Sequence, residues 1–567
     1  LNSIGSRIVL GDEGQLDYDG NNILQSAKST STEGGDDIIT LGGASSSDIN
    51  IVIGGVGSLD KITTGNSTDI VLGDNGEIQW TSGLLDSISS TNTAAGGTDE
   101  ITLGNGTKTV IGGTGGDTIT TGASGIHRVI GDNGEISYEA GALRNISSSD
   151  DVNGGLDKIT LSGDINQVIG GSDKDIISVT TASSTDHILG DNGEMNYSGA
   201  IGAEQLTNLQ SNLNQAGGDD IITLGSGDKV VIAGKGGDTV QTTLNSVGSR
   251  IVLGDEGQLN YDSNNILKSA KSTSIEGGDD IITLGGASSS DSNIVIGGVG
   301  SLDTITTGDS TDIVLGDNGA IQWTGGQLDS ISSTDATVGG TDEITLGNGN
   351  KTVIAGTGND SITTGAGNND ILADTGTLDY AAGTFTADEN GMGDDVIVTG
   401  LGDQRILGGY GVDKITTTDG KDVILGDTGT LQYDGTDLAQ ATSVGVDGAA
   451  DIINAGIGDK IVLAGAGNDE ITLGNGDSDI VSDNGVLDYA NQIFSADNSV
   501  SGDDVIMAGN GAHRVLSGNG SDSITLGTGN NIIIADTGVI DETAQTATAD
   551  AFGNGADIIV VADGDNR

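Results

Sequence analysis

The sequence contains no cysteine and no proline, and aromatic residues are scarce. Without cysteine, neither a disulfide-stapled fold nor a thiolate-bound metal is possible. The absence of proline and of a Gly-X-Y period excludes collagen. Two tryptophans, eight tyrosines and three phenylalanines among 567 residues are too few for a conventional large globular core. Aliphatic side chains must therefore build the interior.

Basic residues are also scarce, with 20 lysines and arginines against 83 acidic residues and a formal net charge of −63. Nucleic-acid binding is excluded because phosphate contacts need clustered Lys and Arg, and an anionic membrane surface would repel the chain. No apolar run reaches the length of about 18 residues that spans a bilayer. A compact fold must offset this self-repulsion, and bound divalent cations are the natural means.

A long repeat organises the chain. The sequence of residues 1–16 recurs almost unchanged at 244–259, and that of 34–48 recurs at 277–291. We expect one continuous repeat solenoid over 1–567, with a first long repeat at 1–243, a second, diverging one at 244–486 and further modules at 487–567. The chain starts and stops inside a repeat, so we expect a segment of a longer polypeptide or a processed form.

A shorter module lies within the long repeat, about ten times, at spacings of 53–64 residues. Its marker is a small residue followed by Asp, any residue and Gly; the small residue is Gly11, Gly73, Gly131, Gly190, Gly254, Gly316, Ala373, Gly426, Ser482 or Ala535. We interpret markers such as Asp74-Asn75-Gly76 as tight turns with positive φ, rather than ligand sites, followed by a capping strand. The Ser/Thr-rich insert that follows is expected to form a lateral ledge or a hairpin.

A period of nine residues fills the rest of each module. Residues 96–122 read GGTDEITLG, NGTKTVIGG, TGGDTITTG, with an aliphatic residue at a fixed place: Ile101, Val110 and Ile119. Nine residues suit a glycine turn plus a short strand, so two units make an 18-residue coil of two parallel strands. The sequence predicts an all-β fold, a parallel β-roll or β-solenoid with three coils per module. A propeller is disfavoured because its blades are longer and carry aromatic signatures.

One position in the turns differs in a regular way between successive nonapeptides. Two residues before the inward aliphatic, every first and third nonapeptide has Asp: Asp37, Asp60, Asp99, Asp117, Asp157, Asp175, Asp220, Asp238, Asp280, Asp303, Asp342, Asp360, Asp395, Asp413, Asp451, Asp469, Asp504, Asp522 and Asp557. The second nonapeptide never has a carboxylate there, but Asn50, Lys108, Asn166, Lys229, Asn293, Lys351, Gln404, Lys460 or His513.

This asymmetry predicts a metal-binding edge. First and third turns lie on the same edge of the roll, one coil or about 4.8 Å apart, where two carboxylates repel unless a cation lies between them. Ca²⁺ accepts six to eight oxygen ligands, including backbone carbonyls. The nineteen aspartates are therefore predicted calcium ligands, in preference to ordinary turn residues. The opposite edge is expected to be largely free of ions and held by side-chain hydrogen bonds.

Two segments carry a family resemblance. Residues 112–120 (GGTGGDTIT) and 408–416 (GGYGVDKIT) fit the repeats-in-toxin (RTX) nonapeptide, Gly-Gly-x-Gly-x-Asp-x-aliphatic-x. The chain thus resembles the RTX-type calcium-binding β-roll family. The resemblance implies Ca²⁺ bound by turn aspartates and glycine carbonyls, folding triggered outside the cell, and type I export. The chain differs from that family in that alternate nonapeptides lack Asp and inserts interrupt every module.

These observations favour a structural role over catalysis. We expect a calcium-stabilised extracellular structural or adhesive repeat region of a large bacterial surface or filament protein. Its expected partners are calcium ions and either copies of itself in a filament or sheath, or surface polysaccharide. Catalysis needs a singular constellation, whereas here every polar cluster is repeated; His127, His187 and His513 lie in three different modules. The alternatives are a carbohydrate- or ice-binding module, or the accessory repeats of a secreted polysaccharide-modifying enzyme.

Overall fold

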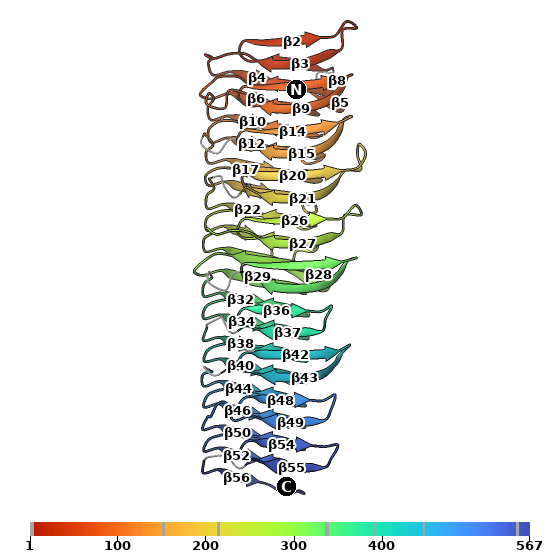
Figure 1. Cartoon of the computed structure of the whole chain (residues 1–567). Helices are drawn as coiled ribbons and strands as arrows, with labels where there is room; N and C mark the ends of the chain where they lie inside the picture. Colours follow the sequence, from red (N-terminus) through yellow and green to blue (C-terminus); the bar gives the residue numbers. More distant parts are fainter. Residues whose placement is uncertain are drawn as a thin grey trace. The chain divides into compact units, whose positions relative to one another are not determined.

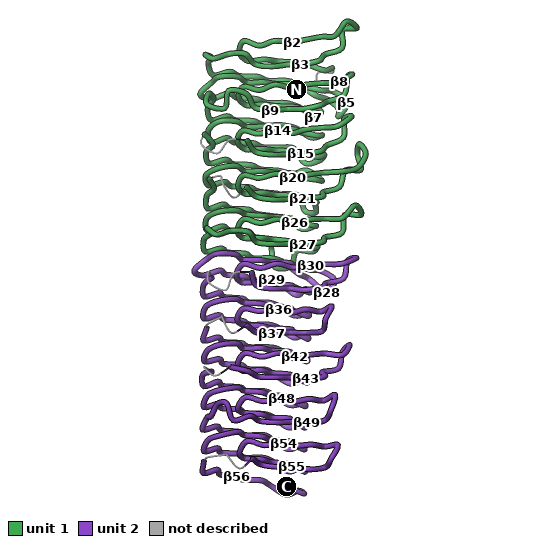
Figure 2. The backbone as a smooth tube through the Cα atoms, viewed as in Figure 1, with its two compact units in different colours: residues 1–285 green, residues 286–567 purple. Residues whose placement is uncertain are grey.

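The computed structural model describes residues 5–149, 153–212, 216–334, 339–388, 393–445, 448–550 and 555–567. Within these ranges every regular element is a β-strand, and no helix is long and apolar enough to cross a membrane. The chain divides into two compact units, residues 1–285 and 286–567 (Figure 2). Each unit is a parallel β-solenoid with short strands, which confirms the predicted fold class.

Short parallel strands form the coils of both units. In the first unit they are β1 (Arg7–Leu10), β4 (Ile38–Thr40), β5 (Ala44–Ile53), β6 (Lys61–Thr63), β7 (Asn66–Leu72), β10 (Glu100–Thr102), β11 (Lys108–Ile111), β12 (Thr118–Thr120), β13 (Ile126–Ile130), β16 (Lys158–Leu161), β17 (Ile165–Gly171), β18 (Ile176–Val179), β19 (Thr185–Asp191), β22 (Ile221–Thr223), β23 (Lys229–Ile232), β24 (Thr239–Gln241) and β25 (Ser249–Leu253). The next strand, β28, runs from Ile281 to Gly298. In the second unit they are β29 (Thr304–Asp317), β32 (Glu343–Leu346), β33 (Lys351–Ile354), β34 (Ser361–Thr364), β35 (Asn369–Leu372), β38 (Val396–Val398), β39 (Gln404–Leu407), β40 (Lys414–Thr417), β41 (Asp422–Leu425), β44 (Ile452–Ala455), β45 (Lys460–Leu463), β46 (Glu470–Leu473), β47 (Ser478–Val481), β50 (Val505–Ala508), β51 (His513–Leu516), β52 (Ser523–Leu526), β53 (Ile532–Ile534) and β56 (Ile558–Val561).

Antiparallel hairpins follow each group of parallel strands. In the first unit they are β2 (Gly14–Tyr18) with β3 (Leu24–Ser29), β8 (Gly76–Thr81) with β9 (Leu84–Ser90), β14 (Gly134–Glu139) with β15 (Ala142–Ser148), β20 (Gly193–Ser198) with β21 (Gln205–Ser211), and β26 (Gly257–Tyr261) with β27 (Leu267–Ser272). In the second unit they are β30 (Gly319–Thr324) with β31 (Gln327–Ser333), β36 (Gly376–Asp379) with β37 (Thr384–Ala387), β42 (Gly429–Asp434) with β43 (Asp437–Ser443), β48 (Gly485–Asp488) with β49 (Ile493–Ala496), and β54 (Gly538–Asp541) with β55 (Thr546–Ala549).

Strand register confirms the 18-residue coil. Ile101 of β10 pairs with Ile119 of β12, and Val110 of β11 pairs with Val129 of β13, so alternate strands stack on each other. Strands β4, β6, β10 and β12 follow one another in one column (Figure 1). Strand β12 then pairs directly with β16 of the next module, Ile119 opposite Ile159. The expected three coils per module are therefore wrong: each module adds two, or about 10 Å at the usual strand spacing.

The remaining residues of a module form the hairpin. Strand β14 pairs with β15 and also with β9 of the preceding module, so the hairpins of a unit make a third, antiparallel wall. The tight turn between β14 and β15 has positive φ at Ala140 and Gly141, which is typical of two-residue hairpin turns. The positive φ expected in the markers is absent at Asn133 and Gly134, whereas Gly376 of another marker has a φ of 156°. The Ser/Thr-rich insert supplies β15, which confirms the hairpin alternative.

The three walls enclose a narrow aliphatic core. Ile101, Val110 and Ile119 are fully buried, as the nine-residue period predicts, and the hairpin adds Ile136 and Ile146, also fully buried. Side chains alternate across each strand, so Thr118 faces solvent beside buried Ile119. Aliphatic side chains fill the inward positions of the coil strands, while the hairpin wall also takes Phe385 and Phe494, both buried.

We expect Ile119→Ala to destabilise the first unit by about 2–5 kcal/mol, because it removes buried aliphatic atoms and leaves a cavity. Thr118→Ala, which changes the adjacent exposed residue, is the matched control and should shift stability by less than about 1 kcal/mol. Urea unfolding followed by circular dichroism measures both changes. Equal shifts in the two variants would contradict the assignment of Ile119 to the core.

Candidate metal-binding site

In each unit the predicted aspartates form a stacked line along one edge, nine in the first unit and ten in the second, hereafter together the aspartate row. The backbone N–H of Asp99 donates to Oδ1 of Asp117 at 2.6 Å, and the N–H of Asp117 donates to Oδ1 of Asp157 at 2.6 Å. The same bond joins successive members from Asp37 to Asp280 in the first unit and from Asp303 to Asp557 in the second. The predicted stacking of first and third turns is thereby confirmed.

These carboxylates are buried rather than displayed on the turns. Asp117 is 1 % exposed and Asp157 is fully buried. While Oδ1 accepts the stacking bond, a buried Oδ2 has no hydrogen-bond partner at Asp37, Asp60, Asp99, Asp117, Asp157, Asp175, Asp220, Asp238, Asp342, Asp360, Asp395, Asp413, Asp451 and Asp469. At Asp522 the hydroxyl of Ser517 lies close enough to favour the charged form. A buried carboxylate oxygen without a partner is strongly unfavourable unless something outside the chain satisfies it.

A backbone carbonyl accompanies these oxygens. A Cβ added to Gly112 would overlap both Oδ2 of Asp117 and the carbonyl oxygen of Gly131. Gly73 stands in the same relation to Oδ2 of Asp99 and the carbonyl oxygen of Gly112. Glycine leaves room at these positions for a carboxylate and a carbonyl oxygen to approach the same place. Both are hard oxygen donors of the kind that Ca²⁺ prefers.

The marker aspartates form a second buried line that the sequence interpretation assigned only to turns. Asp132 accepts hydrogen bonds from Ser172 through its N–H at 2.6 Å and its Oγ at 2.9 Å, and from the N–H of Gly155 at 3.2 Å. Asp74 accepts in the same way from the N–H groups of Thr114 and Gly97. Each marker carboxylate thus ties its own module to the next. The signal was the recurrence of Asp in all ten markers, which a turn alone does not require.

Burial and repulsion between neighbouring carboxylates raise the pKa values of buried aspartates in both lines. Burial raises the pKa of Asp99 to about 7 and that of Asp74 to about 8, and the charges of nearby aspartates add to both shifts. Burial and the charge of Asp360 raise the pKa of Asp342 to about 10. For Asp117, burial raises the pKa well above its usual range, and the charges of Asp157, Asp99 and Asp74 contribute. Without cations, these groups cannot all be ionised at neutral pH.

The carboxylates are spread along the edge rather than gathered at single points. Among the described residues, no three or more His, Cys, Asp or Glu side chains converge as metal ligands. An ion at this edge would therefore take few carboxylates and draw its other ligands from backbone carbonyls and water. Calcium tolerates such a mixture because its coordination is flexible and entirely oxygen-based.

On the opposite edge, lysines and asparagines of the chain contact the buried aspartates, as expected from the side-chain hydrogen bonding that the sequence predicts there. Nδ2 of Asn50 donates to Oδ1 of Asp69 at 2.8 Å, and Nζ of Lys108 lies 2.6 Å from Oδ2 of the same aspartate. Equivalent buried pairs join Lys229 to Asp186, Lys351 to Asp312 and Lys460 to Asp422. The hydrogen bonding is confirmed, but the pairing of each lysine with an aspartate one coil away was not predicted.

In calcium-free buffer, the free energy of unfolding should be greatest near pH 4 and fall as the pH rises toward about 9. The pKa is 3.8 for an ordinary aspartate but about 6 for Asp60 and about 9 for Asp360 in the folded state. The folded protein therefore keeps protons that the unfolded chain releases, and this stabilisation is lost as the pH passes the folded values. Thermal unfolding across this pH range measures it; a melting temperature that rises with pH would contradict it.

Comparison with known proteins identifies no relative of this chain. No family model matches the chain, and no curated protein or solved structure matches it. The fold, the buried aspartates and their unsatisfied oxygens are therefore the basis on which function is inferred.

Proposed function

We propose that the chain is a calcium-stabilised extracellular repeat region, structural or adhesive, of a large bacterial surface or filament protein of the RTX β-roll type. The observation that carries this proposal is the run of buried Oδ2 atoms without partners along the aspartate row. Lysines pair with buried aspartates on the opposite edge, whereas described row members such as Asp99 and Asp117 are followed by further aspartates. Divalent ions from outside the chain would supply them.

The donor set fits calcium better than a transition metal. Zinc and copper sites use imidazole or thiolate ligands, and the aspartate row offers carboxylate and backbone carbonyl oxygens. In the module at 96–148, Oδ2 of Asp99 and of Asp117 would hold the ion, together with carbonyl oxygens such as that of Gly131. A bound cation would lower the raised pKa values and allow the carboxylates to stay ionised.

Calcium dependence favours an extracellular location. Weak calcium sites with dissociation constants of about 10⁻⁴–10⁻³ M are typical of extracellular modules, since calcium is abundant there. Inside the cell, a chain with a net charge of −63 and empty sites would repel itself and resist folding. Folding would then begin only after export.

Recurrence of the carboxylates favours a structural role over catalysis. The aspartate row and the opposite edge repeat from module to module, so each ion would stiffen one part of the roll. Each repeat in a solenoid contacts only its neighbours, and ties between modules determine how well the array holds together. Copies of the same chain or a surface polysaccharide are the proposed partners.

Removal of calcium at neutral pH should abolish most of the β-sheet signal. At a free calcium concentration a hundred times the dissociation constant of a site, binding to that site stabilises the folded state by about 2.7 kcal/mol. A few such sites therefore decide whether the roll folds. Far-UV circular dichroism and thermal unfolding, with calcium and then with EGTA, measure this effect. Magnesium at the same ionic strength is the control for charge screening. An unchanged spectrum and melting temperature in EGTA would rule the proposal out.

Asp395→Asn isolates the metal role of one member of the aspartate row. The asparagine oxygen can still accept the N–H of Asp360, which Asp395 accepts at 2.7 Å, but the unsatisfied Oδ2 becomes an amide. We expect fewer calcium ions per chain by titration calorimetry. In calcium-free buffer at neutral pH, the variant should retain more β-sheet signal than the wild-type chain, because a buried charge is removed.

The neighbouring Asp394 is exposed and provides the matched control. Asp394→Asn removes the same charge from the surface and should leave the calcium stoichiometry unchanged. If both variants bind as many ions as the wild-type chain, Asp395 is not a ligand.

A further inference from the structure

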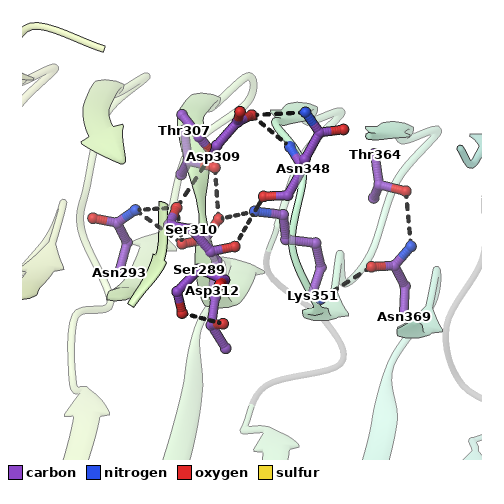
Figure 3. Close-up of polar contacts among 12 residues, drawn as sticks. Ser289, Asn293, Thr307, Asp309, Ser310, Asp312, Asn348, Lys351, Thr364 and Asn369 are labelled. Carbon is purple, nitrogen blue, oxygen red and sulfur yellow. Dashed lines mark hydrogen bonds and ion pairs between the residues drawn. The ribbon is translucent and has the colours of Figure 1, made fainter. Parts of the chain in front are cut away.

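The opposite edge contains lysines and aspartates in contact and sealed from water. In the second unit, Nζ of Lys351 lies 2.6 Å from Oδ2 of Asp312, and both side chains are completely buried (Figure 3). The two residues lie on neighbouring coils, opposite each other in register on β33 and β29. An amine and a carboxyl group are therefore held together without competing water.

Hydrogen-bond donors surround the carboxyl group. Oδ1 of Asp312 accepts from Nδ2 of Asn293 at 2.8 Å and from Oγ of Ser310 at 2.7 Å. Oγ1 of Thr307 donates to Oδ2 at 2.7 Å. Donors fixed at Oδ1 would stabilise negative charge developing on that oxygen during attack at the carboxyl carbon, as an oxyanion hole does.

The first unit repeats this arrangement. Oδ1 of Asp69 accepts from Nδ2 of Asn50 at 2.8 Å and from Oγ of Ser67 at 2.7 Å, while Nζ of Lys108 lies 2.6 Å from Oδ2. A third site joins Lys229 to Asp186 at 2.7 Å, and there Nδ2 of Asn166 donates to Oδ1 at 2.7 Å. The three sites share a buried Lys–Asp contact and an asparagine amide on Oδ1.

Burial also favours the uncharged amine at two of the three lysines. Burial lowers the pKa of Lys108 and of Lys229, and the adjacent aspartate opposes the shift. In a medium of low polarity, transfer of one proton from the ammonium to the carboxylate converts the ion pair into an amine and a carboxylic acid. Holding these groups in contact replaces a bimolecular encounter with an intramolecular reaction.

We propose that Lys108 with Asp69, Lys229 with Asp186 and Lys351 with Asp312 condense into intramolecular isopeptide bonds that staple neighbouring coils. In each case the amine nitrogen Nζ bonds to Cγ of the aspartate, and the Cγ–Oδ2 bond breaks. The departing oxygen leaves as water with the proton it received from the ammonium and a second proton from the attacking amine. One amide bond forms and one water is lost, with no change in oxidation state.

A fourth lysine supplies an internal control. Nζ of Lys460 is 3.3 Å from Oδ2 of Asp422, and Oδ1 of Asp422 accepts the backbone N–H of Gln404 instead of an asparagine amide. The greater separation and the absence of the asparagine amide predict that this pair remains an ion pair. The rival explanation for all four sites is a permanent buried ion pair.

Mass spectrometry of the denatured full-length chain tests the proposal. We expect a mass lower than that of the sequence by three water molecules. After proteolysis, the peptide of Lys351 should be recovered as a branched product with that of Asp312, whereas Lys460 and Asp422 should appear on separate linear peptides. A mass equal to that of the sequence would overturn the proposal, whatever the behaviour of any variant.

Lys351→Arg identifies the bond directly, since a guanidinium retains the positive charge but is a poor nucleophile at neutral pH. After allowance for the side-chain change, this variant should lose two waters instead of three. Lys460→Arg is the matched control and should still lose three. Equal water losses in the two variants would contradict a bond at Lys351.

Discussion

Within each unit, the structure depends on the hydrogen bond from the backbone N–H of one row aspartate to Oδ1 of the next. This bond turns the carboxylate inward and brings its second oxygen against a glycine such as Gly112, where a side chain would collide with it. The requirement for glycine, the buried charge and the unsatisfied Oδ2 all follow from that geometry. A turn that only reversed the chain would leave its aspartate in water at little cost.

Both edges of the roll contain buried carboxylates, and the two edges differ in the groups that surround those charges. On one edge, Lys108 and Asn50 surround Asp69, so the buried carboxylate has both a countercharge and hydrogen-bond donors within the chain. On the other edge, Asp99 and Asp117 are followed by further aspartates. The first edge thus pairs these buried charges within the chain, while under the proposed calcium binding the second would take its countercharges from solution. The stability of such a fold would then depend on its ionic environment.

The period of nine was sufficient to predict the parallel strands, the buried aliphatic positions and the stacking of the aspartates, because all three depend on contacts between equivalent residues. Two features were missed for a physical reason. The alternating residues after the marker suit a coil strand as well as a hairpin, and only pairing with the preceding module's β9 makes β14 part of a separate wall. Likewise, Asp74 bonds to Thr114 of the next module, and no local pattern indicates that partner.

Hydrogen bonds and ion pairs between modules define the order of the modules, which the aliphatic core alone does not define. The coils present isoleucine or valine to their neighbours, so Ile119 would pack as well on another isoleucine as on Ile159. A core of identical layers resists unfolding but does not define which layer comes next. The contacts of Asp132 with Ser172 and of Lys108 with Asp69 occur only in the native order of modules, because a slip by one coil would leave these buried polar groups unpaired. Register is therefore set by the buried polar residues, and stability by the aliphatic ones.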